Sequence, residues 1–136
     1  MRAKITSISF LFPMPKIQSF TGLKAWQEGH KLVLKIYKAT NNFPQSEQFG
    51  LTQQLRRAGV SITSNLAEGF SKQSKKEKTQ FYRTALASLT EVQNQILVAR
   101  DVTYLQKKQF DDIAEQTVLV SKLINGLIKS IQSRTP

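Results

Sequence analysis

Lysine and arginine side chains gather in the middle of the chain, where they could bind phosphate groups. The stretch Ser64–Lys78 reads SNLAEGFSKQSKKEK. From Arg56 to Arg83 seven cations face two acids, Glu68 and Glu77, which leaves an excess of five positive charges. Lysine supplies a mobile point charge that suits phosphate. The candidate nucleic-acid-binding residues are Arg56, Arg57, Lys72, Lys75, Lys76, Lys78 and Arg83.

The composition agrees with a polyanionic partner and argues against several other kinds of site. The 136 residues include 20 Lys and Arg against 9 Asp and Glu, a net charge of +11, which favours nucleic acid or an acidic protein surface. The chain has no cysteine, so thiol chemistry, disulfides and thiolate metal sites are excluded. His30 is the single histidine and is expected to pack on an apolar helix face. No carboxylate or histidine pair has the spacing that general acid–base catalysis needs, so we expect no catalytic residue, metal or cofactor.

A helical scaffold must position the basic residues. Apolar residues recur at spacings of three and four almost continuously from Leu23 onward, which predicts four helices at about 22–41, 46–70, 74–103 and 106–132. Ser46 is a candidate N-cap of the second helix. Ser74 and Glu77 fit the S-x-x-E capping box at the start of the third. Short connections favour an all-α, antiparallel, up-down-up-down four-helix bundle, a single domain over residues 20–136.

The fourth helix carries more apolar surface than one packed face requires. Its regular seam consists of Phe110, Ile113, Thr117, Val120, Ile124, Leu127 and Ile131. Further apolar residues beside the seam are Ala114, Val118, Leu119, Leu123 and Ile128. This excess predicts burial in a second direction, as in an oligomer.

A stripe of polar and small residues follows one face of the second helix. The segment AGVSITSN has low helix propensity, and its small side chains would permit close helix approach. A polar pocket or a subunit contact is the alternative. Antiparallel pairing about a corner at residues 71–73 places Arg57 opposite Ala87, one turn from Glu91, and Glu68 near Lys75 and Lys76. We therefore expect Arg57 or Arg56 to pair with Glu91. The predicted structural polar network comprises Arg57, Ser61, Asn65, Glu68 and Glu91.

Three stretches of the chain resemble a known bacterial family. They read SFTGLKAWQEGHKLVLKIYKATNNFP, FGLTQQLRRAGVSITSNLAEGFSKQSKKEKTQFYRTALASLTEV and LINGLI. They are similar to the four-helix-bundle proteins encoded in intervening sequences of bacterial large-subunit (23S) ribosomal RNA genes, over about Phe20 to Ile131. Gly59, where alanine would be expected, and Leu66, where isoleucine is commoner, depart mildly from the pattern.

The resemblance implies a ring-like homo-oligomer, expected to be a pentamer, with no established enzyme activity. More distantly, the chain resembles the accessory proteins of diversity-generating retroelements, basic pentameric bundles that engage a reverse transcriptase and its RNA. Closed symmetry would repeat the basic segment around one axis and strengthen binding to a polyanion.

Residues 1–19 are expected to form a leader outside the fold, either disordered or preceding a true start at Met14. No apolar run reaches the roughly 18 residues of a membrane span, so we expect no membrane partner and a cytoplasmic location.

Two hypotheses follow for function. The first is a non-catalytic homo-oligomeric module that binds RNA or DNA through phosphates. The alternative is a protein-interaction adaptor, for example for a reverse transcriptase, with no direct nucleic-acid contact. Phosphate binding should weaken steeply with salt, whereas an apolar protein contact should change little.

Overall fold

The chain forms four long α-helices and two short 3-10 helices in a computed structural model that describes residues 20–133. In order they are η1 (Phe20–Gly22), α2 (Lys24–Thr40), η2 (Gln45–Glu47), α3 (Leu51–Ser71), α4 (Lys75–Asp101) and α5 (Lys107–Ser133). No strand occurs within this range, so the predicted all-α class is confirmed. The predicted leader at 1–19 lies outside the described residues.

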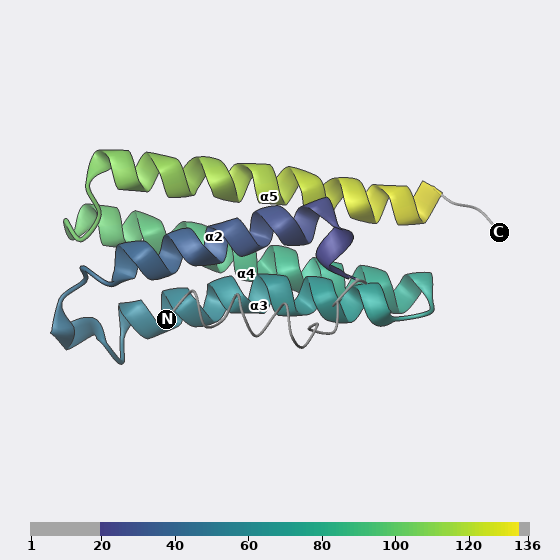
Figure 1. Cartoon of the computed structure of the whole chain (residues 1–136), viewed down its shortest axis with the longest axis horizontal. Coiled ribbons are helices and arrows are strands. Elements are labelled where there is room, and N and C mark those ends of the chain that lie inside the picture. The colour runs from purple at the N-terminus through teal and green to yellow at the C-terminus, as the bar shows by residue number, and fades with distance from the viewer. Residues whose placement is uncertain (1–19, 134–136) are drawn as a thin grey trace, which may run out of the picture.

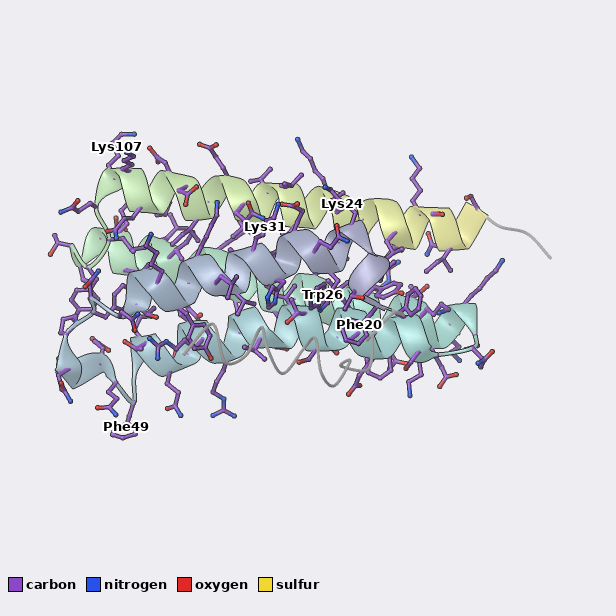
Figure 2. All side chains as sticks on the ribbon, in the orientation of Figure 1. Phe20, Lys24, Trp26, Lys31, Phe49 and Lys107 are labelled. Atoms are coloured by element: carbon purple, nitrogen blue, oxygen red, sulfur yellow. The ribbon has the colours of Figure 1, made fainter. Side chains whose placement is uncertain are left out.

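Each long helix packs against the next one, and α5 returns to pack against α2 (Figure 1). Consecutive helices run in opposite directions, and α3 and α4 share the most extensive contact. At the start of α2 the Phe20 ring meets the edge of Trp26 with ring centroids 5.4 Å apart, which anchors the entry of the chain (Figure 2). Within residues 20–133 no helix is long and apolar enough to cross a bilayer.

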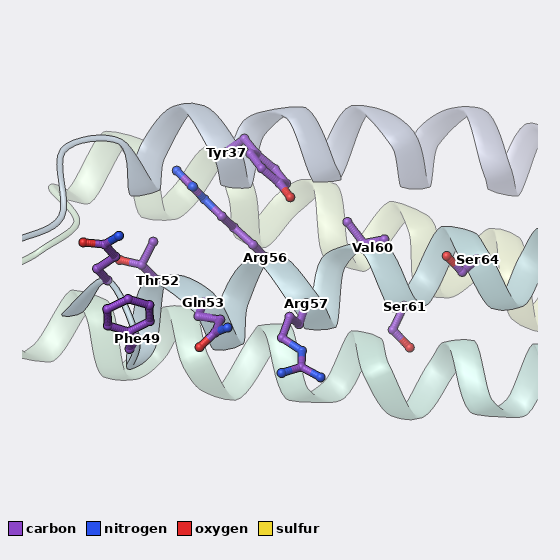
Figure 3. Close-up of a pocket in the computed structure, with 10 residues that line it drawn as sticks. Tyr37, Phe49, Thr52, Gln53, Arg56, Arg57, Val60, Ser61 and Ser64 are labelled. Atoms are coloured by element: carbon purple, nitrogen blue, oxygen red, sulfur yellow. The ribbon is translucent and has the colours of Figure 1, made fainter. Parts of the chain in front are cut away.

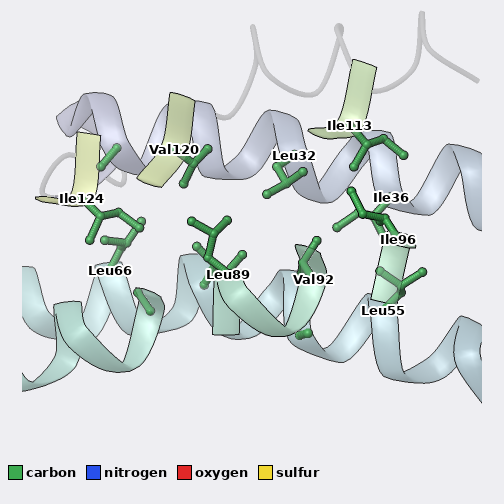
Figure 4. Close-up of a cluster of buried hydrophobic side chains, with 14 of the residues drawn as sticks. Leu32, Ile36, Leu55, Leu66, Leu89, Val92, Ile96, Ile113, Val120 and Ile124 are labelled. Carbon is green, nitrogen blue, oxygen red and sulfur yellow. The ribbon is translucent and has the colours of Figure 1, made fainter. Parts of the chain in front are cut away.

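The core is a column of aliphatic side chains along the bundle axis (Figure 4). All four long helices contribute to it, and full burial of one such side chain is worth about 1.5–3 kcal/mol. Its members include Leu32, Ile36, Leu55, Ile62, Leu66, Leu89, Val92, Ile96, Ile113, Val120 and Ile124. The buried faces of α3, α4 and α5 follow the three-and-four spacing of the sequence. On α2 the buried face includes Leu32 and Ile36, whereas His30 and Tyr37, which follow the same spacing, are exposed.

On α5 the predicted seam is buried except at Phe110 and Leu127. Ile128 lies in the core, whereas Leu127 is half-buried. Val118 and Leu119 remain 48% and 40% exposed, so the apolar excess predicted for this helix lies on the surface of the protomer.

Small residues bring α2 and α3 together. A Cβ placed on Gly29 would lie 3.2 Å from Thr63 Cγ2, and one placed on Gly59 would lie 3.0 Å from Ile36 Cδ1. Larger side chains at either position would push the helices apart. The close approach explains the low-propensity segment of α3 as packing.

The start of α3 differs from the prediction. Ser46 lies in η2, and α3 begins five residues later at Leu51, so Ser46 is not its N-cap. The N-cap is Gly50, which has no side chain to cap the helix, and the Glu47 Oε1 accepts from the Leu51 N–H at 3.0 Å. Glu47 Oε2 accepts from the Tyr104 hydroxyl at 2.9 Å. The Leu51 amide and then the Tyr104 hydroxyl lower the pKa of Glu47, and the single carboxylate joins the two connections at this end of the bundle.

The start of α4 agrees with the prediction in its main bond. The Ser74 hydroxyl accepts from the Glu77 N–H at 3.1 Å. The same hydroxyl donates to Glu77 Oε1 at 3.1 Å, so the Glu77 carboxylate is bonded to the Ser74 side chain. This bond replaces the contact with the Ser74 amide that the capping box predicts.

The register between α3 and α4 is shifted by about one turn from the predicted one. Ser61 Oγ lies 2.8 Å from Ser88 Oγ, which places Arg57 near residue 92 instead of Ala87. Side chains lean toward the N-terminus of their own helix. In this hairpin the side chains of α3 therefore lean away from the corner, and the side chains of α4 lean toward it. As a result, a given residue of α3 contacts a residue farther along α4 than a count of residues from the corner predicts.

A buried carboxylate joins α2 to α5. Glu28 is 6% exposed, and its Oε1 accepts from Gln116 Nε2 at 3.0 Å. Lys31 and Lys24 lie 3.1 and 3.5 Å from Oε2. The Gln116 bond first, and the lysines with it, hold the pKa of Glu28 below the ordinary glutamate value of 4.5, whereas burial opposes the shift.

We predict that Gly69→Ala destabilises the protein whereas Gly126→Ala does not. A Cβ on Gly69 would lie 2.6 Å from Tyr82 Cε1 and 3.0 Å from Phe81 Cβ, and the buried Tyr82 ring has no room to withdraw. Overpacking of this kind costs about 1–3 kcal/mol. Gly126 has no atom within 4 Å of its added Cβ, so alanine there should add about 0.5–1 kcal/mol through helix propensity. Urea unfolding of both variants tests the pair, and equal effects would contradict the close approach.

We predict that Glu28 stabilises the fold at neutral pH and loses this effect in acid. A carboxyl group whose pKa is lowered on folding contributes stability above its unfolded pKa and loses it as pH falls through the folded one. The wild type should therefore exceed Glu28→Gln in free energy of unfolding at pH 7, and the difference should close below about pH 4.

Chemical denaturation across pH measures this difference, with Glu91→Gln on the exposed face of α4 as the matched control. A difference between wild type and Glu28→Gln that is independent of pH would assign the effect to packing instead of charge.

Candidate nucleic-acid interface

The seven predicted cations fall into two groups on the α3–α4 hairpin. The lysine corner consists of Lys72, Lys75, Lys76, Lys78 and Arg83, where α3 ends and α4 begins. The arginine pair, Arg56 and Arg57, lies near the start of α3. At 1.5 Å per residue the two groups are about 22 Å apart along the helix axis. They are therefore two sites instead of the single patch that the sequence suggests.

Two members of the lysine corner have structural contacts. Lys78 Nζ donates to the carbonyl oxygens of Phe70 at 2.7 Å and Gly69 at 3.3 Å, so it closes the C-terminal end of α3. Lys72 Nζ lies 5.2 Å from the centroid of the Phe81 ring. Because both amines already contact other groups of the protein, they are weaker candidates for binding a phosphate than their neighbours.

The other three members of the lysine corner are free. Lys75, Lys76 and Arg83 are exposed and form no hydrogen bond or ion pair with another described residue. The first two occupy the first turn of α4, where the helix macrodipole disfavours positive charge. Their placement opposes helix stability.

Arg56 is held in one orientation at the other end of α3. Its Nε donates to Thr40 Oγ1 at 2.9 Å, and its Nη2 donates to Asn41 Oδ1 at 3.1 Å. Its Cζ lies 4.6 Å from the centroid of the Tyr37 ring. Arg57 is exposed and has no such partner among residues 20–133.

The arginine pair lines a surface groove between α2 and α3 with a volume of about 620 Å³ (Figure 3). Tyr37 and Phe49 also line it, 40% and 82% exposed. Sequence reasoning missed both aromatics, because Tyr37 follows the same three-and-four spacing as the apolar residues of the predicted helix 22–41, and Phe49 falls inside the predicted helix 46–70. In the structure Phe49 precedes α3, which begins at Leu51. A large aromatic next to Gly50 in a connection was the available signal. Figure 2 shows Phe49 pointing away from the bundle.

The predicted polar network is smaller than expected. Asn65 Nδ2 donates to the Ser61 carbonyl at 2.8 Å and reaches Ser61 Oγ at 3.1 Å. Ser61 in turn bonds Ser88, a residue absent from the prediction. The side chains of Glu68 and Glu91 are exposed and bond no other described residue.

The predicted ion pair between Glu91 and Arg56 or Arg57 is therefore absent. Arg57 and Glu91 line one surface pocket between α3 and α4, together with Gln95. The buried Oε1 of Gln95 has no hydrogen-bond partner. Arg56 is directed to α2 instead, because the Thr40 hydroxyl and the Asn41 side-chain oxygen accept hydrogen bonds from its guanidinium.

Other ionisable groups have structural surroundings. His30 is exposed and stacks on Trp26 with centroids 4.9 Å apart, which corrects its expected place on the packed face. Tyr104 donates to Glu47, and this bond raises the pKa of its phenol. The described residues contain no group of three histidine or carboxylate side chains that could hold a metal ion.

None of the seven predicted cations forms an ion pair with a described acid. The five ion pairs of residues 20–133 use cations elsewhere: Lys24 and Lys31 with Glu28, Lys35 with Asp112, Arg100 with Asp101, and Lys107 with Asp111. The acids of these pairs lie on α2, α4 and α5, and the exposed Glu68 and Glu91 of the hairpin pair with none of the seven cations. The α3–α4 hairpin presents its positive charge to solvent.

Comparison with known proteins agrees with this architecture. A crystal structure of a protein of unknown function from the S23 ribosomal protein family of Bacteroides thetaiotaomicron superposes with a TM-score of 0.72 at 20% sequence identity. The match covers 77% of this chain and 95% of that one, and it supports the fold. No curated protein matches the chain.

The family model for 23S rRNA-intervening sequence proteins matches residues 21–126, which include all of α2, α3 and α4 and most of α5. The chain therefore belongs to the family of 23S rRNA-intervening sequence proteins.

Proposed function

We propose that this protein is a non-catalytic homo-oligomeric module that binds nucleic acid through the phosphate backbone. The absence of ion pairs at the seven cations of the α3–α4 hairpin supports this function. A cation without an acidic partner keeps its full attraction for phosphate, and each contact releases counterions from the nucleic acid. The net charge of +11 adds long-range attraction.

Exposed apolar residues on α4 and α5 support the oligomer. Gln93 Nε2 donates to Thr117 Oγ1 at 3.1 Å across these helices. Leu97 is one turn from Gln93 and Val118 adjoins Thr117, and both are exposed in the protomer. Such a surface is stabilised when a second copy covers it. We infer a closed ring, for which the family resemblance leads us to expect five subunits.

Assembly would strengthen nucleic-acid binding. A ring repeats the lysine corner around one axis, so phosphates along one strand can be bound by several subunits at high effective concentration. The alternative, a protein adaptor, uses the same bundle but has no need of unpaired lysines in the first turn of α4.

We predict that Lys75→Gln/Lys76→Gln weakens RNA binding without loss of stability. Affinity for a structured RNA should fall steeply between about 50 and 200 mM salt, and the double variant should reduce the logarithmic salt slope by about 1 per lysine. Thermal stability should stay the same or rise slightly, because two cations leave the positive end of a helix. Fluorescence anisotropy and thermal unfolding measure both effects.

Lys122→Gln/Lys129→Gln on exposed positions of α5 is the matched control, since it removes the same net charge elsewhere. Equal loss of binding in both double variants would assign the effect to net charge alone. A wild type that binds no RNA at the lower salt would favour the protein adaptor.

We predict that Val118→Asp dissociates the oligomer and leaves each protomer folded. The side chain is half-exposed in the protomer, so a carboxylate there is tolerated until a second copy buries it. Light scattering should show a smaller particle with unchanged helix content by circular dichroism. Leu34→Asp, at an exposed apolar position on α2, is the control and should keep the wild-type mass. A Val118→Asp particle of wild-type mass would contradict an interface on α4 and α5.

A further inference from the structure

The groove between α2 and α3 differs in character from the lysine corner. It combines two arginines, two exposed aromatics and neutral polar groups (Figure 3). No acid is among its lining residues, and apart from the two arginines all of them are uncharged. Neighbouring grooves contain carboxylates, Asp112 between α2 and α5 and Glu91 between α3 and α4. This groove is therefore suited to a ligand that carries both negative charge and flat apolar faces.

Arg56 provides a preformed planar surface in the groove. Two hydrogen bonds to Thr40 and Asn41 fix its guanidinium, and Tyr37 supports one side of it. A guanidinium has five N–H donors, so donors remain for a ligand after these two bonds. Because its orientation is already fixed, little further side-chain entropy is lost when a ring stacks on it or a phosphate binds.

Phe49 provides a second stacking surface about two helical turns from Arg56. Its ring is 82% exposed, the most exposed of the large apolar side chains described. The backbone beside it is held by the Gly50 N–H, which donates to the Glu47 carbonyl at 2.9 Å, and by the Glu47 carboxylate on Leu51. The ring is thus presented to solvent from an ordered connection. Burial against a ligand would remove its contact with water.

Unpaired nucleobases match these features. Each base offers a flat face that stacks on an aromatic or a guanidinium, while the linking phosphate suits a free cation such as Arg57. In double-stranded nucleic acid each base is already stacked between its neighbours, so its flat faces cannot contact side chains on the protein surface. The glutamine and serine side chains of the groove can donate to base edges.

We propose that the groove between α2 and α3 binds single-stranded nucleic acid, with bases stacked on Phe49 and on the Arg56–Tyr37 pair and a phosphate on Arg57. This inference rests on the proposed function, and it makes an unpaired strand the preferred ligand of the protein. The lysine corner then contributes attraction to any phosphate backbone, and the groove contributes the preference for exposed bases.

The test compares oligouridylate, oligothymidylate and a duplex of equal length, each labelled with fluorescein, on the full chain. Both single strands should bind more tightly than the duplex at moderate salt. Phe49→Ala should weaken single-strand binding roughly 5- to 150-fold and leave duplex binding unchanged. The salt slope should not change, because no charge is removed. Phe49→Trp should restore binding, and Leu34→Ala, which removes an exposed side chain outside the groove lining, should bind as the wild type.

Several outcomes would overturn the inference. If Phe49→Ala binds single strands as tightly as the wild type, or if the duplex binds equally well, the groove does not stack bases, although phosphate binding by the protein would stand. A changed particle mass for Phe49→Ala in light scattering would make the groove a subunit contact. Polyglutamate is also added as a competitor. If it displaces the bound strand from the wild type but not from Phe49→Ala, the groove binds an acidic protein segment instead. Failure of all three oligonucleotides to bind at low salt would reject the proposed function as well.

Tighter binding of oligouridylate than oligothymidylate would support the inference for RNA, and the reverse would support it for DNA.

Discussion

Gly69 lets the last turn of α3 approach Tyr82 of α4 so closely that a Cβ would lie 2.6 Å from the ring. This contact brings Lys78 of α4 within hydrogen-bond distance of the last carbonyls of α3. The corner is thus closed by packing and by a cation at once. Because α3 carries the arginine pair and α4 carries most of the lysine corner, the spacing between the two groups depends on this one approach.

The distribution of acids explains how a chain with a charge of +11 folds and still presents a basic surface. Glu47 and Glu77 stabilise the starts of α3 and α4, and Glu28 is buried between α2 and α5. The aspartates pair with cations at the ends of α2, α4 and α5. Most carboxylates therefore stabilise the fold locally, and the repulsion among the remaining cations is balanced by the apolar core. A polyanion bound at the hairpin would relieve that repulsion.

The sequence predicted the helices better than the contacts between them. Apolar periodicity placed the buried faces, and Ser74 marked the start of α4, because both signals act within one or two turns of a helix. The prediction that Ser46 is the N-cap of α3 was wrong, because Ser46 lies in a 3-10 turn and the neighbouring Glu47 accepts from the first amide of α3. Residue spacing alone does not distinguish this geometry from a helix that begins at Ser46. The pair with Glu91 did not form even though the observed register brings Arg57 near residue 92. Arg57 and Glu91 are both exposed at one surface pocket, and Arg56 is bonded to Thr40 and Asn41 instead.

The groove could not be predicted for a related reason. Tyr37 and Phe49 come from different segments, and they line one groove with Arg56 only once Gly29 and Gly59 have allowed α2 to pack close to α3. Periodicity assigned Tyr37 to the apolar stripe of its helix, whereas the structure places it at the edge of that stripe, under a guanidinium.

The two basic groups are suited to different contributions to the free energy of nucleic-acid binding, electrostatic attraction and base stacking. Free lysines at a helix start attract phosphate from a distance, and that attraction weakens with salt. Stacking on Phe49 and Arg56 acts at contact and depends little on salt, but it requires unpaired bases. With the arginine pair and Lys72 about 22 Å apart along the axis of α3, a strand bound at both groups must run along that helix. A ring of subunits would repeat that path, so a long unpaired strand could bind several protomers where a short one binds a single protomer. The length of the strand, more than its sequence, would then control affinity.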